Sequence, residues 1–304
     1  MKKSQKLIIL AVSLVLAGLI IGSIGLFSVN FDFTKLSLSQ PTTNTHSVEE
    51  DFTCISIDTD ISDIRLEMSQ DNTCQVVCQE DANCFHTVSV ENYTLTIAMQ
   101  DNRLWYEHIG MTFGTSHSIT VYLPKKAYED LSVNCNTADV EIPKGFSFGH
   151  ADITTTTGDI KWQGSMVNNL LISVSTGDVF VDDTGCQNLT AKTTTGDIRF
   201  SHTIITQNLT AKTTTGDVRF DRSDAHTMDI KTTTGDVTGT LLSYKRFTVI
   251  TDTGTLHLPS MADNTNNTTF VITDETGKVL STGPSAPGPC NITTTTGDVH
   301  IELS

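Results

Sequence analysis

Proline, aromatic residues and basic side chains are all scarce in this sequence. Its 304 residues include 7 prolines, and Phe, Trp and Tyr make up 7% of the chain, whereas Thr and Asp are abundant. This composition disfavours a proline-rich disordered stalk and a helical bundle, so we expect an all-β protein. A hydrophobic fraction of 38% still allows a sizeable core.

Basic residues are too few to balance the acidic ones. The chain has 19 Lys and Arg against 35 Asp and Glu, which gives a formal net charge of -16 at pH 7. Such a surface repels phosphates, so nucleic acid is excluded as a partner and anionic lipid headgroups are disfavoured. Cations and cationic peptides are attracted instead.

The motifs of common catalytic centres are also missing. The sequence has no His-Glu-x-x-His, no Gly-x-Ser-x-Gly and no phosphate-binding Gly-Lys-Ser/Thr loop. His86, His108, His117 and His150 are scattered, and the turn-like segment from Gly114 to Ser118 has no partner acid in view. We therefore expect no enzyme and assign no catalytic, cofactor-binding or metal-binding residue. A polysaccharide-acting carboxylate pair stays open as the alternative.

One long apolar run stands near the N-terminus, from Leu7 to Phe27. Its length matches the ~20 residues that a helix needs to cross a bilayer. Three lysines at positions 2, 3 and 6 favour a cytoplasmic N-terminus and an extracytoplasmic remainder. We predict a cytoplasmic segment at 1–6, a single-pass transmembrane helix at 7–27 and a linker at 28–45 in a cell-membrane protein. A cleaved signal peptide is the alternative, and it leaves the compartment of the remainder unchanged.

Seven cysteines would then lie where disulfides can persist. Cys54, Cys74, Cys78 and Cys84 are close in sequence, and their spacing is not a usual zinc spacing. We predict one or two bridges among these four rather than a metal site, with the pairing left open.

From residue 131 onward, Thr-Thr-Thr-Gly-Asp followed by Ile or Val recurs about every 20 residues. The repeats are marked by Ala138, Gly158, Gly177, Gly196, Gly216, Gly235, Gly254, a degenerate Gly277 and Gly297. Apolar residues lie seven and five positions before each of these residues and two and four positions after it. This alternation indicates two strands joined by a corner. We predict a parallel β-helix of about nine coils over 131–304, preceded by an irregular, cysteine-containing β cap over 46–130.

Stacked coils would align polar side chains into rows. The Thr three positions before each glycine is expected to face inward and to bond along the ladder. Outward-facing Lys192, Lys212 and Lys231 form a basic stripe, with Arg199 and Arg219 across the corner. We interpret this stripe as a solvated face rather than a glycan or phosphate site.

An aspartate follows the glycine in most coils: Asp159, Asp178, Asp197, Asp217, Asp236 and Asp298. Neighbouring carboxylates about 5 Å apart could share a calcium ion. One carboxylate per coil is few for an ion that takes about six to eight oxygens, and Asp beside Gly is a common corner residue. We interpret the row as corner residues and keep a calcium-stabilised rod as an alternative.

The N-terminal anchor, the segment from Tyr122 through Val140 and the Thr-Gly-Asp-Ile/Val coils together resemble the bacterial putative-adhesin family. The resemblance covers roughly residues 50–304. It implies a domain of β-strand repeats at the cell envelope with a binding or scaffold role, in adhesion or in the envelope-stress response. It implies no catalytic residues and no cofactor, and its partners would be envelope components.

Overall fold

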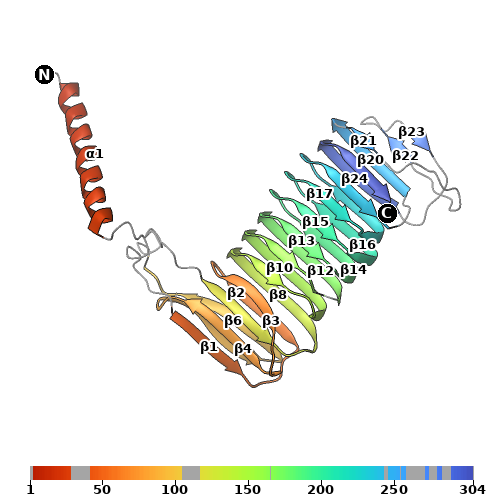
Figure 1. Cartoon of the computed structure of the whole chain (residues 1–304), viewed down its shortest axis with the longest axis horizontal. Helices are drawn as coiled ribbons and strands as arrows, with labels where there is room; N and C mark the ends of the chain where they lie inside the picture. The colour runs from red at the N-terminus through yellow and green to blue at the C-terminus, as the bar shows by residue number, and fades with distance from the viewer. Residues whose placement is uncertain are drawn as a thin grey trace.

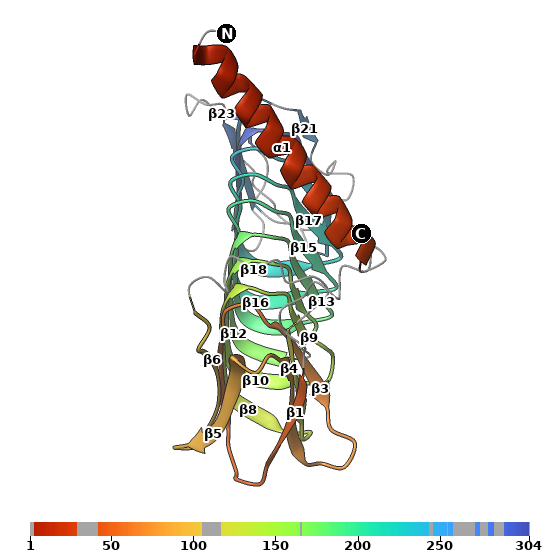
Figure 2. The same cartoon turned by 90° about the vertical axis from the view of Figure 1, so that its left-hand side faces the viewer.

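The computed structural model describes residues 3–28, 42–104, 117–164, 166–242, 246–253, 255–257, 271–273, 279–282 and 289–303. These residues form one N-terminal helix, α1 (Lys3–Ser28), and an elongated rod of strands (Figure 1). The strands belong to two sheets that face each other along the rod (Figure 2). The prediction of an all-β repeat domain is confirmed for the described residues beyond the helix.

The first sheet contains, in spatial order, β1 (Thr42–Val48), β4 (Cys74–Glu80), β7 (Ser118–Leu123), β3 (Asp63–Met68), β9 (Val140–Ile142), β11 (Ile160–Trp162), β13 (Val179–Asp182), β15 (Ile198–Ser201), β17 (Val218–Asp221), β19 (Val237–Leu241), β25 (Val299–Leu303) and β21 (Leu256–His257). The second contains β23 (Val279–Thr282), β22 (Val271–Thr273), β20 (Arg246–Thr253), β24 (Pro289–Thr296), β18 (Asp224–Lys231), β16 (Ile204–Lys212), β14 (Gly185–Lys192), β12 (Met166–Thr176), β10 (Ser147–Thr157), β8 (Ala127–Thr137), β2 (Cys54–Thr59), β6 (Thr94–Asp101) and β5 (Cys84–Glu91).

Each central coil is a strand in the second sheet, a Gly-Asp corner and a short strand in the first sheet. In the coil of β10 and β11, the predicted inward residues Ala151, Ile153, Ile160 and Trp162 are all 0% exposed. Equivalent strands of successive coils pair in parallel and in register, as β10 does with β12 and β11 with β13. The core is therefore a set of aliphatic rows, because each coil can bury its apolar face only against its neighbours.

The described residues of the predicted cap, 46–104 and 117–130, continue both sheets instead of forming an irregular cap. β2 pairs in parallel with β8, and β3 pairs in parallel with β9, so β2 and β3 make a further coil on the first repeat. β6 and β7 stack on β2 and β3 in the same way. At this end of the described rod, the outermost strands β4, β1 and β5 pair in antiparallel fashion. The coils continue into this region because β2 and β3 carry the same alternation of buried apolar residues as the arms of the later coils.

At the other end the order of the coils differs from the order of the sequence. The last coil, β24 and β25, lies between β18–β19 and β20–β21. β22 and β23 pair with each other in antiparallel fashion, so they are not the two arms of the coil expected around residue 277. Residue 277 itself, residue 254 and most of the expected linker at 28–45 lie outside the described residues.

Helix α1 covers the apolar run at 7–27. Among the residues that the structure describes, no helix combines the length and the hydropathy of a membrane span. The transmembrane assignment of 7–27 is thus not supported by the structure, which supports a helix at this position.

Candidate functional site

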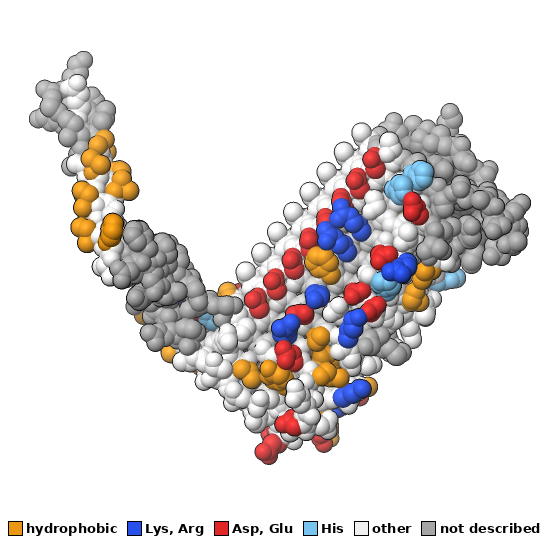
Figure 3. Space-filling model, viewed as in Figure 1, with side chains coloured by type: hydrophobic (Ala, Val, Ile, Leu, Met, Phe, Trp, Pro, Cys, Tyr) orange, Lys and Arg blue, Asp and Glu red, His pale blue; other side chains and the backbone are white. Residues whose placement is uncertain are grey.

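The corner aspartates form a continuous row along one edge of the rod (Figure 3). From Asp159 to Asp236, the Oδ1 atom of each accepts a hydrogen bond from the backbone N–H of the aspartate in the adjacent coil, at 2.7 Å from Asp178 to Asp159 and 2.8 Å from Asp197 to Asp178. The row begins at Asp63, whose Oδ1 binds the N–H of Asp139, and it reaches Asp298. The aspartates therefore hold successive coils together, and we refer to them as the Asp row.

The inward threonines hold the coils together in the same direction. The hydroxyls of Thr193, Thr213 and Thr232 donate to the carbonyl oxygens of the glycine in the preceding coil, at 3.0 to 3.1 Å. Their predicted structural role is confirmed. The outward positions make an exposed, uncharged face consisting of Thr156, Ser175, Thr194, Thr214, Thr233 and Thr295.

The predicted basic stripe is also present. Lys192, Lys212 and Lys231 are register neighbours on β14, β16 and β18. Across the corner, the guanidinium of Arg219 lies 2.6 Å from a carboxylate oxygen of Asp217 and 3.3 Å from one of Asp197. Arg219 and Arg199 neutralise part of the Asp row, whereas Lys212 pairs with Asp229 outside the row. Exposed pairs of this kind are typical of a solvated face.

The cysteines differ from the prediction. All seven are free thiols, and six of them are buried. Cys74 and Cys78 lie on β4 of the first sheet, whereas Cys54 and Cys84 lie on β2 and β5 of the second. The prediction of disulfide bridges was wrong. Although these four cysteines are close in sequence, they are distributed over three strands in two facing sheets, and the two on β4 stand four residues apart along one strand.

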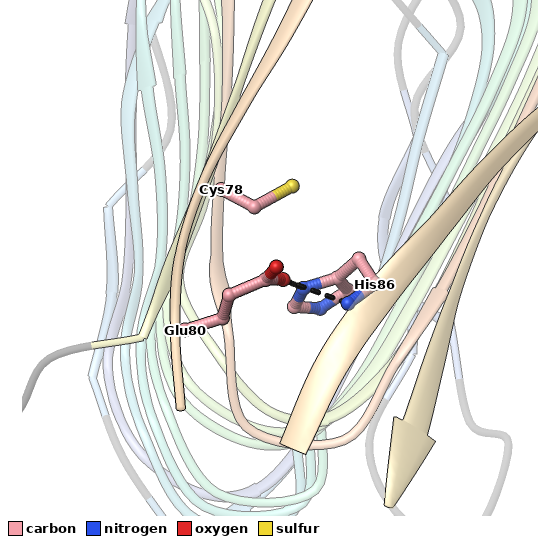
Figure 4. A group of neighbouring side chains, drawn as sticks. All are labelled: Cys78, Glu80 and His86. Atoms are coloured by element: carbon pink, nitrogen blue, oxygen red, sulfur yellow. Dashed lines mark hydrogen bonds and ion pairs between the residues drawn. The ribbon is translucent and has the colours of Figure 1, made fainter. Parts of the chain in front are cut away.

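One of these thiols belongs to a polar cluster inside the N-terminal end of the rod. Cys78 and Glu80 point inward from β4, and His86 points toward them from β5 on the facing sheet (Figure 4). The thiol sulfur, a carboxylate oxygen and an imidazole nitrogen of the three residues lie within 4.8 Å of one another. We refer to these three residues as the Cys-Glu-His cluster.

Hydrogen bonds fix the carboxylate and the imidazole of the cluster. Glu80 Oε2 accepts from the backbone N–H of His86 at 2.7 Å and lies 2.8 Å from His86 Nδ1. On the opposite side of the ring, Nε2 lies 3.2 Å from the hydroxyl oxygens of both Thr59 and Ser62. The Nδ2 amide of Asn44 donates to Glu80 Oε1 at 2.6 Å.

A cavity of about 430 Å³ adjoins the cluster, and its lining includes His46, Glu80, Asp81 and His86. The Nε2 atom of His46 is buried and has no hydrogen-bond partner. A second carboxylate–imidazole pair lies nearby, with 3.1 Å between Asp81 Oδ2 and His117 Nε2. The N-terminal end of the rod thus has several ionisable side chains in its interior, whereas the interior of the coils beyond it is mainly apolar with rows of threonines.

Burial controls the protonation of the cluster. It raises the pKa of the Cys78 thiol to about 12, with a further contribution from the Glu80 charge. It also lowers the pKa of His86, against the opposing effect of Glu80. At neutral pH the thiol is protonated and the imidazole is neutral, which disfavours Cys78 as a nucleophile.

Sequence reasoning missed this cluster. Cys78 was interpreted as a candidate for a disulfide bridge, and His86 and His117 were interpreted as histidines without partners. Of the other two histidines considered there, His150 is exposed and residue 108 lies outside the described residues. A usable signal was present in Cys78-Gln-Glu80, because residues two apart on a strand share a face. The position of His86 opposite that face came only from the fold.

A second potential ligand group, Asp182, Asp183 and His202, lies at the surface.

Comparison with known proteins agrees with this architecture. A putative lipid binding protein from Parabacteroides distasonis superposes with a TM-score of 0.51 at 12% identity, over 86% of this chain and 97% of that chain. A putative adhesin from Bacteroides fragilis gives a TM-score of 0.42 at 12% identity, over 87% and 97%. A putative cell adhesion protein from Clostridium sporogenes gives 0.29 at 10% identity, over 87% and 100%. At these identities the first likeness shows a shared fold.

No curated protein matches the sequence. The family comparison is positive: residues 52–302 match the Toastrack family DUF4097, which covers both the N-terminal end of the rod and the repeats. This chain therefore belongs to the Toastrack DUF4097 family.

Proposed function

We propose that this protein is a non-catalytic binding scaffold, displayed outside the cell membrane and tethered to it by the helix at 7–27. The tether is supported by the exposed apolar side chains of α1, where Leu14, Ile21 and Ile24 are 66%, 71% and 65% exposed. Apolar side chains without a covering partner in water are unfavourable, and a bilayer would bury them. Digestion of intact cells with an added protease should remove the rod; protection of the rod would contradict this topology.

The observation that carries the binding role is the Asp row. Each carboxylate uses one oxygen to hold the next coil, so the row is a straight and rigid line of carboxylates on a chain of net charge -16. Arg199 and Arg219 offset the charge at Asp197 and Asp217, whereas Asp159 and Asp178 form no ion pair with any of the described residues. An uncharged threonine face lies beside it. Fixed charges at a constant spacing favour cationic peptides with many Lys and Arg, because each added cation meets another carboxylate.

The test is binding of a lysine-rich peptide to the full-length chain in detergent. We expect the affinity to fall at least about tenfold between about 50 mM and about 500 mM salt. The double variant Asp159→Asn/Asp178→Asn should bind more weakly than the wild type, because each Asn keeps the acceptor oxygen for the next coil and removes one charge.

The matched control is Glu49→Gln/Glu50→Gln, which removes the same charge from exposed residues at the N-terminal end of the rod. It should bind nearly as tightly as the wild type. Equal binding at both salt concentrations, or equal weakening by the two double variants, would contradict a role for the Asp row.

A further inference from the structure

The geometry points to a transition-metal site at the Cys-Glu-His cluster. We infer that Cys78, Glu80 and His86 bind a divalent ion of the zinc type. His46, whose ring nitrogens lie outside the 4.8 Å group, would become the fourth ligand after rotation of its side chain. This inference is independent of the scaffold function proposed above, because the cluster lies inside the rod and the Asp row lies on its edge.

The first argument is the identity and closeness of the donors. One thiol, one carboxylate and one imidazole offer atoms that all lie within 4.8 Å of one another. Thiolate, imidazole and carboxylate are the ligands of zinc, whereas calcium and magnesium take oxygen donors almost exclusively. The donors come from two facing sheets, so an ion between them would join β4 to β5.

The second argument is that neighbouring groups already orient the ligands. The hydroxyls of Thr59 and Ser62 stand at His86 Nε2, so that nitrogen can carry the ring proton while Nδ1 presents its lone pair to an ion. The Asn44 amide donates a hydrogen bond to Oε1 of Glu80, so that Oε2 is directed toward His86. Metal-ligating side chains in proteins are commonly positioned by such outer hydrogen bonds.

The third argument is the buried imidazole nitrogen of His46. In the β1–β4 register, Asn44 stands opposite Cys78 and His46 opposite Val76, so both side chains are on the sheet face that carries Cys78. His46 lines the same cavity as Glu80 and His86, and its Nε2 atom is buried without a partner. A buried polar atom without a partner is costly, and ligation of an ion would remove that cost.

The cavity also provides a route for the ion and its protons. Thr42, Asn44 and Thr87 line the cavity and are exposed, so the cavity opens to solvent. Binding releases the thiol proton of Cys78 to water. The ring proton of His86 moves from Nδ1, which lies 2.8 Å from Glu80 Oε2, to Nε2, where the hydroxyl oxygens of Thr59 and Ser62 accept it. The charge of the ion offsets the charge of its thiolate and carboxylate ligands.

The test uses cobalt(II) as a spectroscopic substitute for zinc in the full-length chain. We expect about one ion per chain and a thiolate-to-cobalt charge-transfer band, which zinc should abolish by displacement. Cys78→Ser should remove the band and weaken binding more than about 100-fold, and His86→Asn should weaken it to a similar extent. Circular dichroism of each variant checks that the rod is folded.

Two controls separate this site from others. Cys74→Ser removes a buried thiol from the same strand and should leave the band unchanged. His202→Asn alters the exposed ligand group, which has no sulfur and cannot produce the band. The absence of a charge-transfer band, or its survival in Cys78→Ser, would overturn the inference and leave the cluster as an internal hydrogen-bonded group only.

A second measurement does not depend on the folding of any variant. Crystals of the wild-type chain grown with zinc should show an anomalous difference peak within bonding distance of Cys78 Sγ, Glu80 and His86. A peak only at the Asp182, Asp183 and His202 group, or no peak at all, would also overturn it.

Discussion

At the scale of single residues, the corner glycines have a backbone conformation and a close backbone neighbour that a side chain would strain. Gly196 has a φ of +145°, which residues with a Cβ rarely adopt. A Cβ added there would lie 2.0 Å from the carbonyl oxygen of Gly177 in the preceding coil. The same contact recurs in successive coils, so the corner is both a left-handed backbone position and a point of close backbone approach.

We expect Gly196→Ala to lower the stability of the rod by about 3 kcal/mol or more, since backbone strain and a backbone clash act together. For a chain of this size, that loss corresponds to a fall in Tm of roughly 5–10 °C. Thermal unfolding followed by circular dichroism measures it. Gly22→Ala in α1 is the control, because its added Cβ meets nothing within 4 Å; equal Tm values for the two variants would contradict the corner argument.

At the scale of elements, the unusual feature is the position of the last coil. The glycine corner of β24 and β25 stacks directly on that of β18 and β19: a Cβ on Gly297 would lie 2.0 Å from the Gly235 oxygen, and Thr294 donates to that same oxygen. Sequential stacking would place β20 there instead. The end of the chain is thus held between two neighbours, which protects its edge from pairing with other chains.

This order predicts a specific crosslink. Met228 is the register neighbour of Cys290, and adjacent strands lie about 4.8 Å apart, inside the Cα range of a disulfide. In Met228→Cys, mild oxidation should therefore join positions 228 and 290, which a mass shift of the linked peptide detects. Leu209→Cys is the control, because its register neighbours are Leu189 and Met228. A crosslink in neither variant would favour sequential stacking.

At the scale of the whole molecule, the Asp row runs through nearly every described coil and couples stability to pH. Burial alone would raise the pKa of Asp197, but the N–H of Asp217 and the guanidinium groups of Arg199 and Arg219 outweigh it, so this pKa lies below its ordinary value of 3.8. The unfolded chain therefore takes up a proton here at higher pH than the folded chain does. The contribution of Asp197 is complete well above pH 3.8 and is lost as the pH falls through the lowered pKa.

Asp197→Asn tests this coupling, because the amide keeps the acceptor oxygen for Asp217 and cannot ionise. At pH 7 we expect the wild type to be the more stable of the two, since it keeps the ion pairs with Arg199 and Arg219. The difference in Tm should shrink as the pH falls below 3.8. A difference that stays constant down to strongly acidic pH would show that the charge of Asp197 contributes nothing.

Much of the rod could be predicted from local pattern. The apolar alternation around each glycine identified the buried positions, as Ile153 and Ile160 show, and the inward threonines bond where the pattern placed them. These features depend on residues a few positions apart and on a repeat of nearly constant length, so they are visible in the sequence. The Asp row was correctly interpreted as a corner feature, although each carboxylate binds the backbone of the next coil and not its own.

The order of the coils and the Cys-Glu-His cluster could not be read in this way. Because the coils are nearly alike, any coil can stack on any other, and the sequence alone does not distinguish β20 from β24 as the neighbour of β18. His86 meets Cys78 and Glu80 only because β4 and β5 belong to facing sheets at the end of the rod. The sequence by itself determined the repeating strand, corner and core positions, since these follow from short-range periodicity. Tertiary structure decided which coils are neighbours and which buried polar groups meet. Both depend on contacts between segments far apart in the sequence, and a local sequence pattern does not specify such contacts.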